Sequence, residues 1–128
     1  MVLVDTSSWI HFLRPNGDSV VRARVERALK DGEAVWCPIV SLELWNGAGG
    51  DRERSVLRQF ERVLASLSID DGVWSLARAL AREARRQGIS VPATDLLISA
   101  CARHHGADLE TADGDFELLK RLRVTKEN

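Results

Sequence analysis

Short apolar runs alternate along the chain with longer stretches in which apolar residues recur every three or four positions. A short continuous apolar run is typical of a buried strand, and the longer spacing is typical of a helix with one buried face. The predicted strands lie at 2–4, 34–36, 67–69 and 108–111. The first three predicted helices run through 9–13, from a cap at Asp18 or Ser19 to a stop at 31–32, and from Pro38 onward. The other four lie at 51–64, 70–87, 93–105 and 116–122.

Strands that alternate with helices predict an α/β fold with a mainly parallel sheet of four to five strands. Val124 is the candidate for the last strand. The helix at 93–105 is apolar almost all round, which indicates a central, buried helix. Two other predicted helices each have one apolar face. In the helix at 51–64 this face consists of Val56, Leu57, Phe60, Val63 and Leu64. In the helix at 70–87 it consists of Val73, Trp74, Ala77, Leu80, Ala81 and Ala84.

Four acidic residues lie where an apolar run gives way to polar residues, or inside a helix near such a point: Asp5, Glu43, Asp95 and Asp113. In a parallel sheet, ligands bind at the carboxyl ends of the strands. Carboxylates that converge there repel one another, and a hard divalent cation such as Mg²⁺ or Mn²⁺ offsets this repulsion through carboxylate and water oxygens. The pattern therefore indicates a metal-binding acidic site.

Each acid also has a simpler interpretation when it is taken alone. Asp5 could cap the first helix, and Asp95 could complement the positive end of its helix. Asp113 and Asp115 flank a glycine and could make a turn. Glu43 is harder to explain, because an unpaired carboxylate among apolar neighbours is costly. Four such coincidences in one short chain favour the functional interpretation.

The length of 128 residues fits a single domain over 1–128. The net charge of −1 gives no global basic field, which argues against a simple DNA-binding module but leaves an RNA-cutting enzyme with a basic rim open. No run approaches the ~18 apolar residues of a membrane helix. The start of the chain has no basic segment and reaches Asp5 after three apolar residues, so it lacks the pattern of a signal peptide. We therefore expect a cytoplasmic protein.

Four segments together resemble the motifs of the PIN-domain family, most closely those of the VapC toxins of bacterial toxin–antitoxin pairs. They are Val-Leu-Val-Asp-Thr-Ser at 2–7, Ser-Leu-Glu-Leu at 41–44, Asp-Leu-Leu-Ile-Ser-Ala at 95–100 and Thr-Ala-Asp-Gly-Asp-Phe at 111–116. Each motif is weak alone, but four in this order in one short domain are specific. The resemblance extends from Val2 to about Val124.

The resemblance implies a PIN-like α/β/α sandwich and a metal-dependent endoribonuclease that hydrolyses phosphodiester bonds of cellular RNA. It implies Mg²⁺ or Mn²⁺ as cofactor, a cognate VapB-like antitoxin as partner, and a homodimer. The implied site residues are the four acids named above, with Asp5, Asp95 and Asp113 as metal ligands and with Glu43 acting through a coordinated water molecule or orienting the nucleophile. The implied supporting residues are Thr6, Ser7, Thr111 and Asp115.

Glu110 departs from the family pattern, in which this strand position is usually apolar. It either adds an acid beside the site or points away from it. Two other function classes remain as alternatives. A Mg²⁺-binding, receiver-like module requires paired acids after the first strand and a late lysine at a strand end, whereas Asp5 precedes Thr-Ser-Ser, and Lys120 and Lys126 lie in a helix and in the tail. A non-catalytic RNA-binding module is disfavoured by the intact acids.

Overall fold

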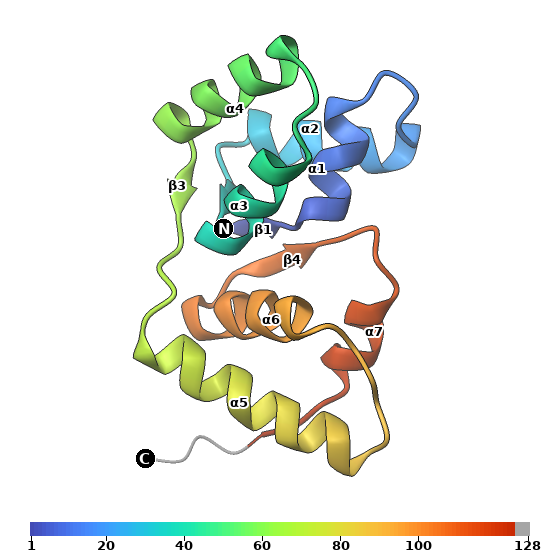
Figure 1. The fold of residues 1–128 in the computed structure, drawn as a ribbon, viewed down its shortest axis with the longest axis vertical. Helices are drawn as coiled ribbons and strands as arrows, with labels where there is room; N and C mark the ends of the chain where they lie inside the picture. Colours follow the sequence, from blue (N-terminus) through green and yellow to red (C-terminus); the bar gives the residue numbers. More distant parts are fainter. Residues whose placement is uncertain (125–128) are drawn as a thin grey trace.

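The computed structural model describes residues 1–124, and its centre is a four-stranded parallel sheet with the strand order β3-β2-β1-β4 (Figure 1). Lys126, considered above, lies outside the described residues. The strands are short because each is a single buried apolar run. Their bounds are β1 Val2–Val4, β2 Ala34–Trp36, β3 Ala65–Ser66 and β4 Asp108–Glu110.

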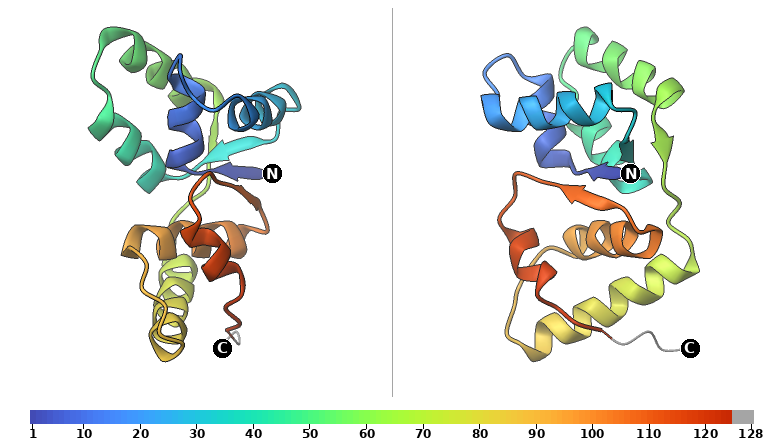
Figure 2. Two further views of the ribbon diagram at one scale, coloured as in Figure 1. Left: turned by 90° about the vertical axis from the view of Figure 1, so that its right-hand side faces the viewer. Right: turned by 180° about the vertical axis from the view of Figure 1, so that it is seen from behind.

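Helices cover both faces of this sheet, so the molecule has the predicted three-layer α/β/α arrangement (Figures 1 and 2). One layer contains α1 (Thr6–Leu13), α2 (Ser19–Lys30), α3 (Pro38–Gly47) and α4 (Asp51–Val63). The other contains α5 (Asp71–Arg86), α6 (Ala93–His105) and α7 (Asp115–Lys120). No helix within 1–124 is long and apolar enough to cross a membrane.

The strand order reverses between β1 and β4, and this switch point places the first and last motifs side by side. The chain moves from β1 outward to β2 and β3, and then returns to β4 on the other side of β1. Val4 pairs with Glu110, and the Asp5 N–H donates a 3.0 Å hydrogen bond to the Glu110 carbonyl oxygen. The residues that follow the two strands, Asp5 and Thr111, therefore leave the sheet together at its carboxyl edge, where open α/β sheets bind ligands.

Local sequence signals explain where several helices begin or end. The Asp18 carboxylate accepts hydrogen bonds from the N–H groups of Val20 and Val21, and Asp70 accepts one from Val73, so both aspartates cap their helices. Helix α6 ends at Gly106, whose φ of +67° lies in the left-handed region that favours glycine. Every residue from Leu97 to Ala102 is buried, on all sides of the helix, which confirms α6 as the central helix.

The core contains an aromatic group on one side of the sheet. Trp9 and Trp36 are buried, and both rings pack against Phe60, with centroids 4.8 and 6.0 Å away. On the other side, α5 packs against α6, and Phe116 of α7 is also buried. This packing fixes α1 and α6, which carry residues of the acidic site.

Several sequence predictions were wrong in detail. The third strand is β3 at Ala65–Ser66 rather than 67–69, because pairing with β2 begins earlier and continues only through the hydrogen bond from the Leu67 N–H to the Trp36 carbonyl. Val124 joins no strand of the described sheet. Val63 and Trp74 were assigned to buried faces, but they are 73% and 47% exposed because they lie in the last and first turns of their helices, where the core no longer covers them.

Candidate active site

Asp5 follows β1 and is held by three hydrogen bonds. One carboxylate oxygen accepts from Ser7 Oγ at 2.7 Å and from the Ser8 N–H at 3.2 Å, while the other accepts from Thr111 Oγ1 at 2.8 Å. Asp5 is therefore the helix cap that its simpler interpretation describes. It is also only 3% exposed and close enough to Asp113 for that charge to raise its pKa, so the two interpretations are compatible.

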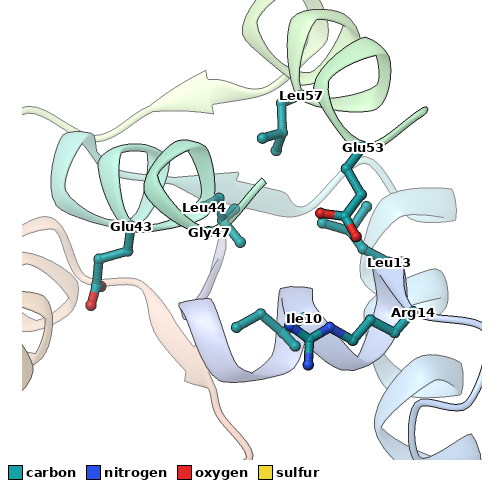
Figure 3. A pocket seen from close by; sticks show the side chains of 8 residues that line it. All are labelled: Ile10, Leu13, Arg14, Glu43, Leu44, Gly47, Glu53 and Leu57. Atoms are coloured by element: carbon teal, nitrogen blue, oxygen red, sulfur yellow. The ribbon is translucent and has the colours of Figure 1, made fainter. Parts of the chain in front are cut away.

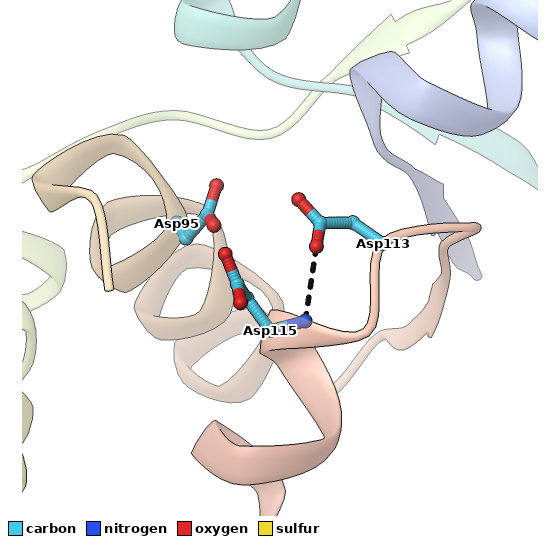
Figure 4. Close-up of side chains that lie close together, drawn as sticks. All are labelled: Asp95, Asp113 and Asp115. Atoms are coloured by element: carbon cyan, nitrogen blue, oxygen red, sulfur yellow. Dashed lines mark hydrogen bonds between the residues drawn. The ribbon is translucent and has the colours of Figure 1, made fainter. Parts of the chain in front are cut away.

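The segment after β4 is fixed by the same hydroxyl groups. Ser7 Oγ accepts a 3.0 Å hydrogen bond from the Ala112 N–H, and Thr111 Oγ1 accepts one of 2.9 Å from the Asp113 N–H. The Asp113 carboxylate in turn accepts a 2.9 Å bond from the Asp115 N–H, drawn as a dashed line in Figure 4. Two small hydroxyl residues thus orient the loop that carries the last acids.

Asp95, Asp113 and Asp115 form a close group of three carboxylates that could hold a metal ion. One oxygen from each lies within 4.8 Å of the others, and Figure 4 shows the three side chains converging from α6, the loop after β4 and the start of α7. Asp95 is 9% exposed, and its Oδ2 is buried without a hydrogen-bond donor among the described residues. An unsatisfied buried carboxylate oxygen is costly and requires an explanation.

Burial and neighbouring charge both disfavour the ionised form of the central acids. Burial, followed by the charges of Asp113, Asp115, Asp5 and Glu43, raises the pKa of Asp95 to about 6. Burial also raises the pKa of Asp5, against the lowering effect of its hydrogen bonds. A divalent cation would remove this cost, because carboxylate oxygens are the ligands that Mg²⁺ and Mn²⁺ prefer. The unpartnered Asp95 oxygen and the converging carboxylates therefore fit such an ion.

Glu43 projects from α3 and is oriented by Thr6, whose Oγ1 donates a 2.8 Å hydrogen bond to Glu43 Oε1. Figure 3 shows Glu43 at one end of a small cavity between α1, α3 and α4, with Arg14 and Glu53 at the other end. The cavity measures about 40 Å³, and Ile10, Leu44 and Leu57 are among its apolar lining residues. Thr6 thus fixes the position of Glu43, and the charge of Glu43 reaches Asp95.

All four acids predicted from the sequence lie at the carboxyl edge of the sheet. Only Asp95 and Asp113 of these four belong to the 4.8 Å group, and they share it with Asp115, which the sequence predicted as a supporting residue. Glu110 is not a member of the group around Asp95. It forms an ion pair with Arg24 of α2 at 2.7 Å and accepts a 2.9 Å hydrogen bond from Ser8 Oγ. Sequence analysis did not identify Ser8 or Arg24, because nothing in the pattern shows that α2 passes beside β4.

Comparison with known proteins agrees with this geometry. The family model of the PIN domain matches residues 2–122. The chain is 34% identical over 126 residues to VapC ribonuclease Mb1587 of Mycobacterium bovis and to ribonuclease VapC11 of Mycobacterium tuberculosis, covering 95% of this chain and 93% of each relative.

Solved structures share the fold at lower sequence identity. FitAcB from Neisseria gonorrhoeae superposes with a TM-score of 0.77 and 24% identity, covering 94% of both chains. VapBC2 from Rickettsia felis, bound to a DNA fragment from its promoter, gives a TM-score of 0.75 and 19% identity over 92% of both chains. With the family match over nearly the whole chain, the four acids at the expected edge and the shared fold, the chain belongs to the PIN-domain family.

Proposed function

We propose that the chain is a metal-dependent endoribonuclease and the toxin component of a bacterial toxin–antitoxin pair. The observation that carries the proposal is the buried Oδ2 of Asp95, which has no hydrogen-bond partner within residues 1–124, on a residue that forms a group with Asp113 and Asp115. The identity of 34% to VapC ribonucleases over 95% of the chain supports a nuclease, and the acidic group supports a divalent ion as its cofactor.

Asp5, Asp95 and Asp113 are the proposed metal ligands, with Asp115 in support because one of its oxygens shares the 4.8 Å group. When bound, Mg²⁺ or Mn²⁺ would neutralise the phosphate, favour ionisation of the attacking water and stabilise the leaving oxygen. The protein holds the ligands in place before the substrate arrives. Thr111 and Ser7 fix Asp5, and the Asp115 N–H fixes Asp113.

Glu43 is the proposed group that orients the nucleophilic water. Thr6 donates a hydrogen bond to one oxygen of Glu43, which leaves the second oxygen available as an acceptor. A general base must lie within hydrogen-bond reach of the proton that it takes. The effect of the Glu43 charge on Asp95 supports a common space between the two carboxylates.

We further propose that the protein is cytoplasmic, acts on cellular RNA, forms a homodimer and is inhibited by a VapB-like antitoxin. Leu42 of α3 and Val63 of α4 are 62% and 73% exposed, which supports an apolar contact surface on this layer. The similar structure from Rickettsia felis is that of VapBC2, which supports an antitoxin as partner. The receiver-like alternative has no support, because Lys120 lies on α7, 3.7 Å from Glu117.

The proposal is tested by incubating total cellular RNA with the purified, antitoxin-free protein and Mg²⁺ or Mn²⁺. Asp95→Asn and a chelator serve as controls, because asparagine keeps the shape of the ligand and removes its charge. Discrete fragments that disappear in both controls would establish the activity. Cleavage by purified Asp95→Asn at the level of the unmodified protein would contradict the assignment.

A further inference from the structure

A second charged site lies away from the acidic group, where the chain leaves α7 and passes the end of α6. It is a cavity of about 380 Å³ lined by two apolar residues and three cationic ones. The lining residues are Leu122, Val124, Arg103, Lys120 and Arg123. No acidic residue of the described chain lines it, although the whole chain has a net charge of −1.

The positive charge of this cavity is poorly compensated within the described residues. Arg103 donates hydrogen bonds to the carbonyl oxygens of Leu119 and Leu122, at 2.5 and 2.9 Å, so its partners are neutral. Burial and the charge of Arg123 lower the pKa of Arg103. Arg123 forms no ion pair with residues 1–124.

Lys120 also remains available to a ligand. Its ion pair with Glu117 spans 3.7 Å between side chains that are 62% and 69% exposed, and such surface pairs contribute little. The three cations line one cavity, and no acid of residues 1–124 is part of that lining, so their charges repel one another. An anion in the cavity would offset this repulsion, and both Arg and Lys bind phosphate groups.

The two helices that bring the acids together also bring these cations together. Helix α6 carries Asp95 near its start and Arg103 near its end, and α7 carries Asp115 at its start and Lys120 at its end (Figure 1). At 1.5 Å per residue, Asp95 and Arg103 are separated by roughly 12 Å along the helix axis. That distance corresponds to about three or four stacked nucleotides at ~3.4 Å each.

We infer that the cavity lined by Arg103, Lys120 and Arg123 binds backbone phosphates of the RNA, a few nucleotides from the bond at the acidic group. The inference rests on the proposed function and adds a second contact surface to it. Phosphate contacts of this kind fix the register of a nucleic acid without reading its sequence. The cavity therefore positions the RNA strand and does not select its bases.

The test measures RNA binding in the Asp95→Asn background with a chelator present, so that cleavage plays no part. A labelled single-stranded RNA is titrated at several KCl concentrations with the full chain and with the pair Lys120→Ala and Arg123→Ala. The loss of two phosphate contacts should reduce the slope of log affinity against log salt by about 1.4. Affinity at 50 mM salt should fall on the order of tenfold or more. Arg103 is kept because it holds the carbonyl groups after α7.

The matched control removes two arginines elsewhere, with Arg58→Ala and Arg62→Ala on the exposed face of α4. An equal change of slope in both pairs would overturn the inference, because it would indicate general surface charge. The charge-keeping pair Lys120→Arg and Arg123→Lys should restore the slope, and failure to restore it would also count against phosphate binding.

The experiments distinguish a failure of this inference from a failure of the proposed function. If the unmodified protein cleaves RNA while the slope is unchanged in the Lys120 and Arg123 variant, the cavity has no role in binding. If the slope falls as expected but no RNA is cleaved under any metal condition, the cavity is confirmed and the chain is a non-catalytic RNA-binding module.

Discussion

Thr111 Oγ1 donates a 2.8 Å hydrogen bond to the Asp5 carboxylate, although the two residues are 106 positions apart in the sequence. The same hydroxyl oxygen accepts the Asp113 N–H at 2.9 Å. One side chain therefore sets the position of two acids, and it can do so because β1 and β4 are parallel neighbours. The contact joins the first and last motifs of the chain into one site.

Thr111→Val should weaken metal binding and destabilise the fold. The substitution keeps the shape of the side chain but leaves the Asp5 oxygen and the Asp113 N–H without their partner, which costs about 1–3 kcal/mol when such a group is buried. Urea unfolding measures the stability, and calorimetric titration with Mn²⁺ measures the affinity. Thr111→Ser keeps the hydroxyl group and should preserve both, so equal losses in the two variants would contradict this role.

Asp95→Asn should stabilise the metal-free protein at neutral pH. The pKa of Asp95 is raised from 3.8 to about 6 in the folded state. Because the folded state binds this proton more tightly than the unfolded state does, the raised pKa stabilises the fold fully below pH 3.8. This stabilisation is lost as the pH rises from 3.8 through about 6. The loss is about 3 kcal/mol at most, at 1.36 kcal/mol per pKa unit.

Urea unfolding of the two proteins at pH 4 and pH 7.5, with a chelator present, measures this effect. The gain from asparagine should be large at pH 7.5 and small at pH 4, because Asp95 is largely protonated at the lower pH in the folded state. A gain that is the same at both pH values would show that the carboxylate charge is not the cause.

Divalent ions should stabilise the unmodified protein and have little effect on Asp95→Asn. An ion that binds only the folded state at 100 times its dissociation constant adds about 2.7 kcal/mol. The shift in melting temperature on adding Mg²⁺ or Mn²⁺ at pH 7.5 measures the effect, and a chelator should reverse it. Because protons compete with the ion for Asp95, the shift should shrink as the pH falls below about 6. An equal shift in melting temperature in both proteins would mean that the ion binds at a site that does not include Asp95.

The sequence predicted which acids lie near one another better than it predicted the details of the fold. Asp5, Glu43, Asp95 and Asp113 were identified because each follows or lies near an apolar run, and such runs determine where strands and buried helices form. The parallel sheet then brings the ends of the strands together. Their roles as ligands remain predictions until the experiments above are done.

Local exposure and long-range polar contacts were less accessible to sequence analysis. Trp74 and Val63 fit the helical period but lie in terminal turns that the core does not cover, so periodicity alone placed them incorrectly. The contacts of Glu110 with Ser8 and Arg24 depend on how α1 and α2 pack beside β4. Such contacts leave no signal in the spacing of residues.

The Glu110–Arg24 pair should contribute more to stability than an ordinary surface pair, because Glu110 is only 12% exposed and also accepts the Ser8 hydroxyl. Glu110→Gln and Arg24→Gln, alone and together, form a double-mutant cycle that isolates the pair. We expect a coupling free energy of about 1–2 kcal/mol, within the range for contacting residues. The exposed pair of Arg54 and Asp51 should give less than about 0.5 kcal/mol in the same cycle. Equal coupling in the two pairs would mean that the partial burial of Glu110 adds no stability. The ion pair would then not be what holds α2 against β4, the strand that leads into the loop with Asp113.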